Sequence, residues 1–436
     1  MDGTDRHLNE QGEAGILIDS LLLKNVACFS DITIPFKKRT TVLVGVNGVG
    51  KTTILTSILA CFIAQEWDAN KKEGKQILPM TREKENQAEI KLLSKKAARH
   101  CQIIYSKNTP FGAINIDFNC ERDFDPRIGR KFFIKIPLVF LPAFRRVTDK
   151  VISGVSREGP PIPETVMAWM KKDPDYSQDQ AENFKQWIVN RYFFRREEWG
   201  DKYVKQLQLL IDIANQIFGE EKQITLDKVN EKMEPIFSTK TGKVPLGSLP
   251  SGVHAIFQCI WKIYEQFEAF YPDSTSPEKE PGLVLIDELD AHLHPEWQQT
   301  ILNVFRDSFP HTQLIISTHS PLIVSGCEKD EAVFLKFEEG SANVIIDNTI
   351  NNPKGWLADR LLTSVFGLKY TRDKEWAENI EKVKNLIANR YVKPLSKKDI
   401  KFLKEMSQDL QLPSSDPAAL LLDPQKLKEI IKEKNA

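Results

Sequence analysis

The sequence is short of three things: long hydrophobic runs, closely spaced cysteines and an excess of either charge. No apolar stretch approaches the about 18 uninterrupted residues that a transmembrane helix needs, so we expect no contact with a membrane. The first residues are polar and acidic, without the pattern of a secretory signal. The 60 basic residues balance the 60 acidic residues. No overall field therefore draws the chain to nucleic acid, and any DNA contact has to come from local patches.

The few cysteines are scattered along the chain, and no two of them have the C-x-x-C spacing. This argues against a zinc site and against a disulfide framework, and it suits reduced thiols. We therefore expect a cytoplasmic protein. The cysteines are Cys28, Cys61, Cys101, Cys120, Cys259 and Cys327.

The sequence does contain a complete glycine-rich loop, GVNGVGKT, at residues 45–52. It follows an apolar strand at 41–44 and precedes a helical segment at 53–67. This arrangement points backbone N–H groups at one place and makes an anion site. Lys51 would reach the β- and γ-phosphates of a nucleoside triphosphate, and the Thr52 hydroxyl would bind Mg²⁺. The expected nucleotide-binding residues are Gly45, Asn47, Gly48, Gly50, Lys51, Thr52 and Thr53.

Two further strands end in residues that suit the same chemistry. The apolar run at 283–286 ends in Asp287 and Glu288. Asp287 is expected to bind Mg²⁺ beside the phosphate loop, and Glu288 is expected to polarise the attacking water as a general base. The run at 313–317 is followed by His319, which in a parallel sheet would reach a γ-phosphate oxygen. A histidine there is often structural, but the other motifs favour a catalytic role.

Continuous apolar strands alternate with helical segments, which predicts an α/β fold with a largely parallel central sheet. We expect an N-terminal lobe with the phosphate loop at 1–147, a mainly helical insertion at 148–240, a C-terminal lobe of the nucleotide-binding domain at 241–350 and a helical region at 351–436. Within the last region, Ser396 and Asp399 offer a helix start.

The phosphate loop, the Asp287-Glu288 pair and His319, separated by a long insertion, resemble the ATP-binding-cassette (ABC) superfamily in its SMC/RecF/OLD branch. Three other segments look like patterns of the same group: 23–29, 287–298 and 361–368. The resemblance implies an ABC/SMC-type ATPase head that hydrolyses ATP to ADP and phosphate as a homodimer or higher homo-oligomer. It also implies ATP rather than GTP, since no N-K-x-D element is present in the expected place.

In this family a signature segment completes the nucleotide site of the partner subunit, and Leu249 to His254 resembles it. Ser251 and Gly252 are the residues expected to act in trans. Pro250 and Val253 depart from the family pattern, which implies slow or conditional hydrolysis.

His292 and His294 follow the Asp287-Glu288 pair. The resemblance places His294 at the subunit interface. A metal-binding pair is the alternative, but the sequence shows no third ligand.

The compact size and C-terminal helices look most like Septu-type anti-phage defence ATPases, which work with an HNH nuclease subunit. A RecF-like ATPase of DNA repair or recombination is the alternative. That reading requires DNA contacts, for which basic clusters are candidates, although solvated surface explains them equally well. The clusters are Lys91, Lys95, Lys96 and Arg99, and Arg127, Arg130 and Lys131.

Two other members of the superfamily fit less well. Pro250, the long insertion and the lack of an assignable Q-loop glutamine count against a transporter motor. A self-contained OLD nuclease would need a Toprim domain after His319, and no Asp-x-Asp pair follows the Toprim-like segment at 337–340.

Overall fold

The computed structural model describes residues 18–66, 87–94, 99–106, 115–120, 136–143, 152, 154–155, 176–198, 200–350, 352–389 and 395–409. The chain divides into two compact units, Met1–Leu361 and Leu362–Ala436. No helix within the described ranges is long and apolar enough to cross a membrane.

The first unit is organised around a six-stranded sheet with the order β14-β13-β3-β12-β11-β7. Five neighbouring strands run parallel, and β14 is antiparallel to β13. Three interior strands, β3, β12 and β11, are buried along their whole length, as expected for a sheet covered on both faces. The predicted α/β fold with a largely parallel sheet is thus confirmed. The strands are β3 (Thr40–Val44), β7 (Leu138–Leu141), β11 (Gly282–Ile286), β12 (Thr312–Thr318), β13 (Ala332–Phe337) and β14 (Val344–Ile346).

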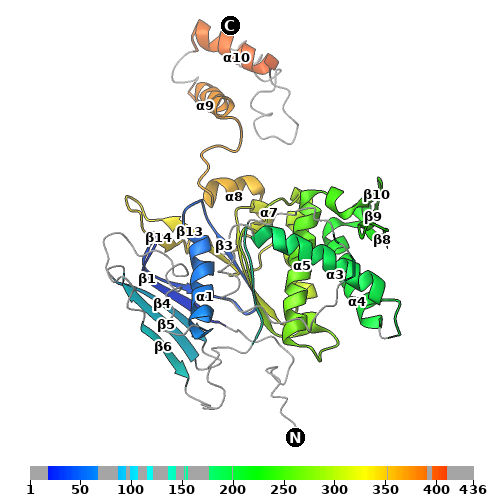
Figure 1. Ribbon diagram of the computed structural model, residues 1–436. Coiled ribbons are helices and arrows are strands. Elements are labelled where there is room, and N and C mark those ends of the chain that lie inside the picture. The colour runs from blue at the N-terminus through cyan, green and yellow to red at the C-terminus, as the bar shows by residue number, and fades with distance from the viewer. Residues whose placement is uncertain are drawn as a thin grey trace. The chain divides into compact units, whose positions relative to one another are not determined.

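A second, antiparallel sheet has the order β2-β1-β4-β5-β6. Helix α1 (Lys51–Glu66) lies between this sheet and the central one (Figure 1). Apolar side chains of both sheets and of α1 form one buried core. The strands are β1 (Ser20–Val26), β2 (Phe29–Pro35), β4 (Gln87–Ser94), β5 (Arg99–Ser106) and β6 (Asn115–Cys120).

Of the basic residues proposed as DNA contacts, Lys91 lies on β4 and Arg99 on β5. The other candidates lie outside the described residues: Lys95, Lys96, Arg127, Arg130 and Lys131.

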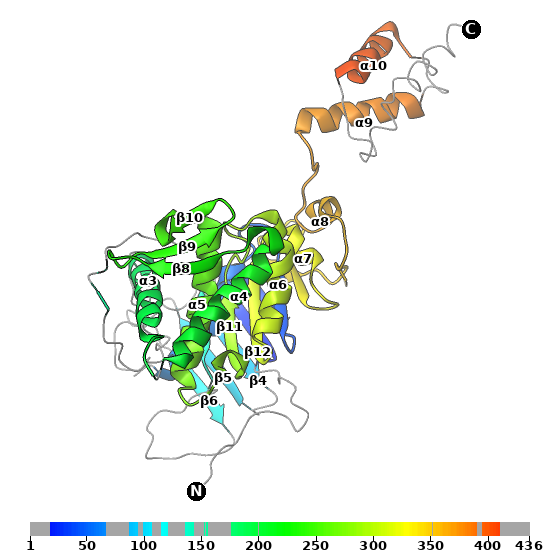
Figure 2. The ribbon, with the colours of Figure 1, turned by 90° about the vertical axis from the view of Figure 1, so that its right-hand side faces the viewer.

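The opposite face of the central sheet carries the helices of the second half of the unit (Figure 2). Helix α4 buries one apolar face, formed by Leu207, Leu210, Ala214 and Ile217, as a core helix does. These helices are α3 (Tyr176–Phe194), α4 (Asp201–Phe218), α5 (Ser251–Phe270), α6 (Pro295–Ser308) and α7 (Pro321–Ser325). Helix α8 (Ala358–Ser364) spans the boundary between the two units.

The segment expected to be a mainly helical insertion also contains two strands of a small antiparallel sheet with the order β10-β9-β8, and the third strand, β10, follows directly after it. Its strands are β8 (Thr225–Val229), β9 (Pro235–Thr239) and β10 (Gly242–Pro245). They are short and mostly polar, so their sequence gives little signal. Packing supports them: Phe237 on β9 is buried, with its ring centroid 5.6 Å from that of Phe257 on α5.

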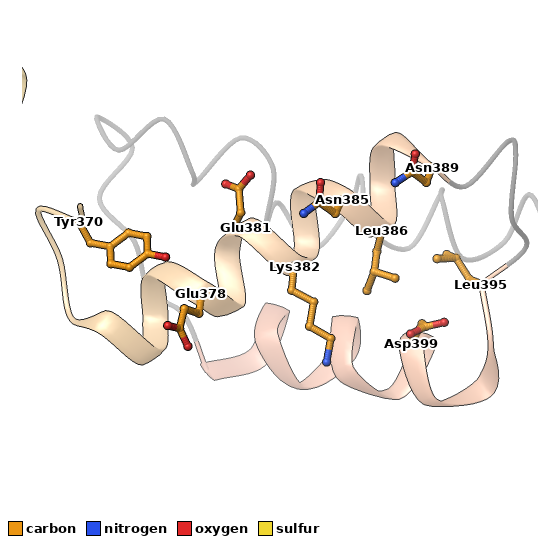
Figure 3. A pocket seen from close by; sticks show the side chains of 9 residues that line it. All are labelled: Tyr370, Glu378, Glu381, Lys382, Asn385, Leu386, Asn389, Leu395 and Asp399. Carbon is orange, nitrogen blue, oxygen red and sulfur yellow. The ribbon is translucent and has the colours of Figure 1, made fainter. Parts of the chain in front are cut away.

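The second unit contains helices α9 (Lys374–Ala388) and α10 (Lys397–Asp409). Ser396 and Asp399 bond reciprocally at the start of α10, as the capping pattern predicts. Lys382 extends from α9 over the Phe402 ring of α10, with Nζ 4.2 Å from the centroid. Nine side chains line a hollow of about 490 Å³ along these helices (Figure 3). The buried core between the helices is formed by Ile380, Val383, Leu395, Leu403 and Met406.

Candidate functional site

The glycine-rich loop connects β3 to α1 and lies at the carboxyl end of the central sheet. Gly50 has a φ of +84°, a conformation that favours glycine. A Cβ on Gly50 would lie 2.6 Å from Phe29 Cζ and 2.7 Å from Cys28 Sγ, so a larger residue does not fit. The loop is therefore held tightly against the turn that precedes β2.

Lys51 is the first residue of α1 and is only 6% exposed. Its Nζ donates to the carbonyl oxygens of Gly45 at 2.8 Å and of Val46 at 3.1 Å. Burial lowers the pKa of Lys51 to about 8, although Asp287 and Glu288 act to raise it. The ammonium is therefore still mainly protonated at neutral pH and holds a positive charge inside the loop.

Thr52 and Asp287 lie side by side although 235 residues separate them in the sequence. Thr52 Oγ1 donates to Asp287 Oδ2 at 2.8 Å, and Ser317 Oγ donates to Asp287 Oδ1 at 2.5 Å. A hydroxyl and a carboxylate are the hard oxygen ligands that Mg²⁺ prefers. The residues present therefore fit the expected ion, with Thr52 and Asp287 as its protein ligands.

Glu288 lies two residues after the end of β11 and is half-buried. Its φ is +48°, which is strained for a residue with a side chain and is found mostly where the surroundings impose it. The Glu288 N–H donates to Ser317 Oγ at 2.8 Å. Because β11 and β12 are parallel neighbours, the ends of both strands meet at one edge of the sheet.

His319 lies at that edge, just after β12, and its backbone is held by Asp290. Asp290 Oδ1 accepts from the His319 N–H at 3.0 Å and from Thr318 Oγ1 at 2.5 Å. Burial and the nearby Lys51 ammonium lower the pKa of the His319 imidazole, against the pull of Asp290 and the other carboxylates. The ring is therefore mainly neutral at pH 7. The sequence did not predict these contacts of Asp290. The only indication of a functional role is its place two residues after Glu288.

Gln298 on α6 links the segments that follow the two candidate catalytic residues. Its Nε2 donates to the Leu293 carbonyl at 2.9 Å, and its Oε1 accepts from Ser320 Oγ at 2.5 Å. Ser320 follows His319, while Leu293 ends the loop that begins with Glu288. The sequence does not predict that Gln298 joins Leu293 to Ser320, because these two residues belong to separate loops.

We expect Gln298→Leu to lower kcat on the order of tenfold with little change in KM, because it loosens both loops without touching the phosphate site. Steady-state ATPase kinetics and a thermal melt check this. Gln299→Leu is the matched control, since Gln299 is exposed on the same helix. Equal losses in the two variants, or a change in KM alone, would contradict the positioning role.

The candidate signature residues lie at the start of α5. Ser251 is exposed, whereas Gly252 and Val253 are buried. A Cβ on Gly252 would lie 2.5 Å from the His292 carbonyl oxygen and 2.9 Å from Trp297 Cζ3. The helix N-terminus is thus packed against the loop that follows Glu288.

His294 is the N-cap of α6 and accepts through Nδ1 from the Glu296 N–H at 3.4 Å. His292 lies in the same loop with a φ of +66°. Within the described part of the chain, no three His, Cys, Asp or Glu side chains gather as a metal site. The structure thus gives His294 a helix-capping contact, and its predicted place at a subunit interface stays a prediction.

Comparison with known proteins gives two family-model matches. An "AAA ATPase domain" model matches residues 17–134, and an "AAA domain, putative AbiEii toxin, Type IV TA system" model matches residues 146–325. Between them the two models cover β3, β11 and β12 of the central sheet.

Among individual proteins, the chain is 24% identical over 377 residues to the Septu protein PtuA of Bacillus thuringiensis, covering 84% of this chain and 88% of that protein. The Septu protein PtuA of Bacillus mycoides (strain KBAB4) is 37% identical over 125 residues, 28% of this chain and 17% of that protein. The Retron Vc95 probable ATPase of Vibrio cholerae serotype O1 biovar El Tor is 37% identical over 83 residues, 19% and 16% of the two chains.

Among solved structures, the SMC head domain from Thermotoga maritima is similar, with 14% identity and a TM-score of 0.42 over 76% of this chain and 98% of that chain. The long match to PtuA and the two ATPase models agree with the resemblance stated from the motifs. The chain is therefore a homologue of the Septu protein PtuA, and two of its segments match ATPase-domain models.

Proposed function

We propose that this protein is the ATP-binding and ATP-hydrolysing switch of an anti-phage defence system, and that it dimerises around ATP and regulates a partner nuclease. The observation that carries the proposal is the convergence of Thr52, Asp287 and Ser317 beside the buried Lys51. The similarity to PtuA along most of the chain supports the defence role.

In the proposed reaction the phosphate loop binds the triphosphate through backbone N–H groups, and Lys51 neutralises its β- and γ-phosphates. Thr52 and Asp287 would hold Mg²⁺, which offsets the charge that develops on the phosphate oxygens. Glu288 accepts the proton of the attacking water. The neutral His319 donates a hydrogen bond to a γ-phosphate oxygen.

The proposed dimer places the start of α5 from a second copy over the nucleotide. Ser251 is exposed, and no side chain caps the first turn of this helix. Uncapped N–H groups at a helix N-terminus, with the positive end of the helix dipole, suit a γ-phosphate. Pro250, which precedes the helix, has no side-chain donor. The Ser251 hydroxyl is therefore the side-chain group of this segment that would contact the γ-phosphate.

Closure of the dimer can be transmitted to the insertion through α6. The Trp297 ring on α6 lies 4.9 Å from that of Phe218, at the end of α4. Thr300 Oγ1 donates to the Ile217 carbonyl at 3.2 Å, and Lys222 pairs with Glu296. Gly252 at the start of α5 also packs closely on Trp297. A shift of α5 would therefore displace Trp297 and, through it, the contact between α6 and α4.

The proposed partner is an HNH nuclease subunit encoded nearby. Co-expression of the tagged protein with its neighbouring gene products, followed by affinity purification, tests this. A stable complex with an HNH protein supports the proposal. A solitary protein whose ATPase rises with gapped DNA would favour the RecF-like repair alternative instead.

A further inference from the structure

An exposed aromatic side chain lies beside the phosphate loop. Phe337, at the end of β13, is 41% exposed, whereas Phe334 and Leu335 on the same strand are buried. Among the exposed large hydrophobic side chains of the described residues, it is the only aromatic one. A single exposed apolar side chain is ordinary on a protein surface, so its position is what matters.

The position of Phe337 follows from strand pairing. β13 runs parallel to β3, the strand that leads into the phosphate loop, with Phe334 opposite Val44 (Figure 1). A Cβ on Gly48 would lie 3.9 Å from Phe337 Cζ, which is van der Waals distance. Gly48 is itself exposed, so the ring and the loop border one open surface.

The order of the strands determines which end of a nucleotide reaches this ring. Asp287, Glu288 and His319 follow β11 and β12, which lie on one side of β3, and β13 lies on the other side. The γ-phosphate has to face the candidate catalytic residues. The ribose and base therefore leave the loop on the side of β13, where Phe337 lies.

The hairpin that carries Phe337 is fixed in place. Asn343 Oδ1 accepts from the Ser30 N–H at 3.0 Å and from Ser30 Oγ at 2.7 Å. The Val344 N–H donates to the Cys28 carbonyl at 3.1 Å. These bonds tie the β13–β14 hairpin to the turn between β1 and β2, which packs on Gly50. The two segments that border the phosphate loop are thus bonded to each other. The aromatic residue that follows that turn, Phe29 at the start of β2, is fully buried and offers no face to a ligand.

We propose that Phe337 is the stacking platform for the purine base of the bound nucleotide. The inference rests on the proposed function, because it requires a triphosphate in the loop. A flat apolar ring that is 41% exposed beside the phosphate loop suits the π-face of a base, and a purine offers a larger π-face than a pyrimidine. In this proposal Phe337 contacts the base of the nucleotide, and the glycine-rich loop binds its phosphates.

The test compares a ligand that has a base with one that lacks it. Isothermal titration calorimetry with Mg²⁺ measures the Kd of ATP and of tripolyphosphate for the wild-type protein, Phe337→Ala and Phe337→Trp. We expect Phe337→Ala to weaken ATP binding about tenfold, to leave tripolyphosphate within about twofold, and Phe337→Trp to retain ATP binding. Val204→Ala, which removes an exposed side chain on α4, is the control.

The outcomes separate this inference from the function on which it rests. If the wild-type protein binds neither ATP nor tripolyphosphate, the proposed function fails. If the wild-type protein binds ATP and Phe337→Ala binds it equally well, only the base platform is overturned. Equal weakening of both ligands also overturns it, because the ring would then support the loop rather than the base. Unchanged ATP affinity together with a lost dimer would assign the ring to a subunit interface instead.

Discussion

Replacement of Lys51 by alanine is expected to abolish ATP binding, with a loss in affinity of about 100-fold or more. Hydrogen bonds to charged groups contribute about 1.5–3 kcal/mol each, and in the proposed function Lys51 bonds the β- and γ-phosphates. Its ammonium already lies inside the loop, bonded to the Gly45 and Val46 carbonyls. Calorimetric titration with ATP measures the loss directly.

The Lys51→Ala protein should remain folded. Burial lowers the pKa of Lys51, which means that the folded state disfavours its charge, and removal of the amine relieves that cost. A thermal melt checks this. Lys354→Ala is the matched control, because Lys354 is an exposed lysine whose surface pair with Glu328 contributes little. ATP binding by Lys51→Ala at the wild-type affinity would show that the loop is not the triphosphate site.

Replacement of Glu288 by glutamine is expected to lower kcat by about 10²–10⁴-fold while ATP binding is retained. Glutamine keeps the size of the side chain but cannot accept the proton of the attacking water. Hydrolysis is the step that opens the proposed dimer, so the variant should accumulate as a closed dimer with ATP. Single-turnover hydrolysis and size-exclusion chromatography with and without ATP provide the two measurements.

The double variant Glu288→Gln, Ser251→Arg separates catalysis from dimerisation. Ser251 is exposed at the start of α5, so an arginine there is compatible with folding but blocks the approach of a second copy. We expect this protein to bind ATP and to remain monomeric. Parental ATP turnover by Glu288→Gln would show that Glu288 is not the base, and an unchanged dimer in the double variant would remove Ser251 from the interface.

The residues of the candidate site could be located in the sequence because each motif is a short run of neighbouring residues. The phosphate loop needs glycines at fixed positions, and Gly50 does contact Phe29 and Cys28 too closely for any larger residue. The burial of β3, β11 and β12 was likewise visible as continuous apolar runs. A strand that is buried on both faces has no polar alternation, so its sequence also predicts a parallel, covered sheet.

The polar network behind the site could not be predicted in this way. Asp290 supports the residues around His319, and Gln298 joins Leu293 to Ser320. These pairs come from separate loops that meet because β11 and β12 are neighbours. Side-chain hydrogen bonds between distant segments follow no sequence period, so only the folded arrangement identifies them. The small β8–β10 sheet was missed for a related reason, since Phe237 contributes to its stability through packing on α5.

The sequence by itself determined that the chain carries a glycine-rich loop between a strand and a helix, a strand followed by two carboxylates and a histidine after the next strand of the sheet, because each motif consists of neighbouring residues. Only the tertiary structure decided which of these side chains meet. It placed Asp287 against Thr52, the start of α5 against the His292 loop, and Phe337 beside Gly48. The physical reason is that strand order in the sheet is set by packing between segments far apart in the chain, and that order brings β13 next to β3.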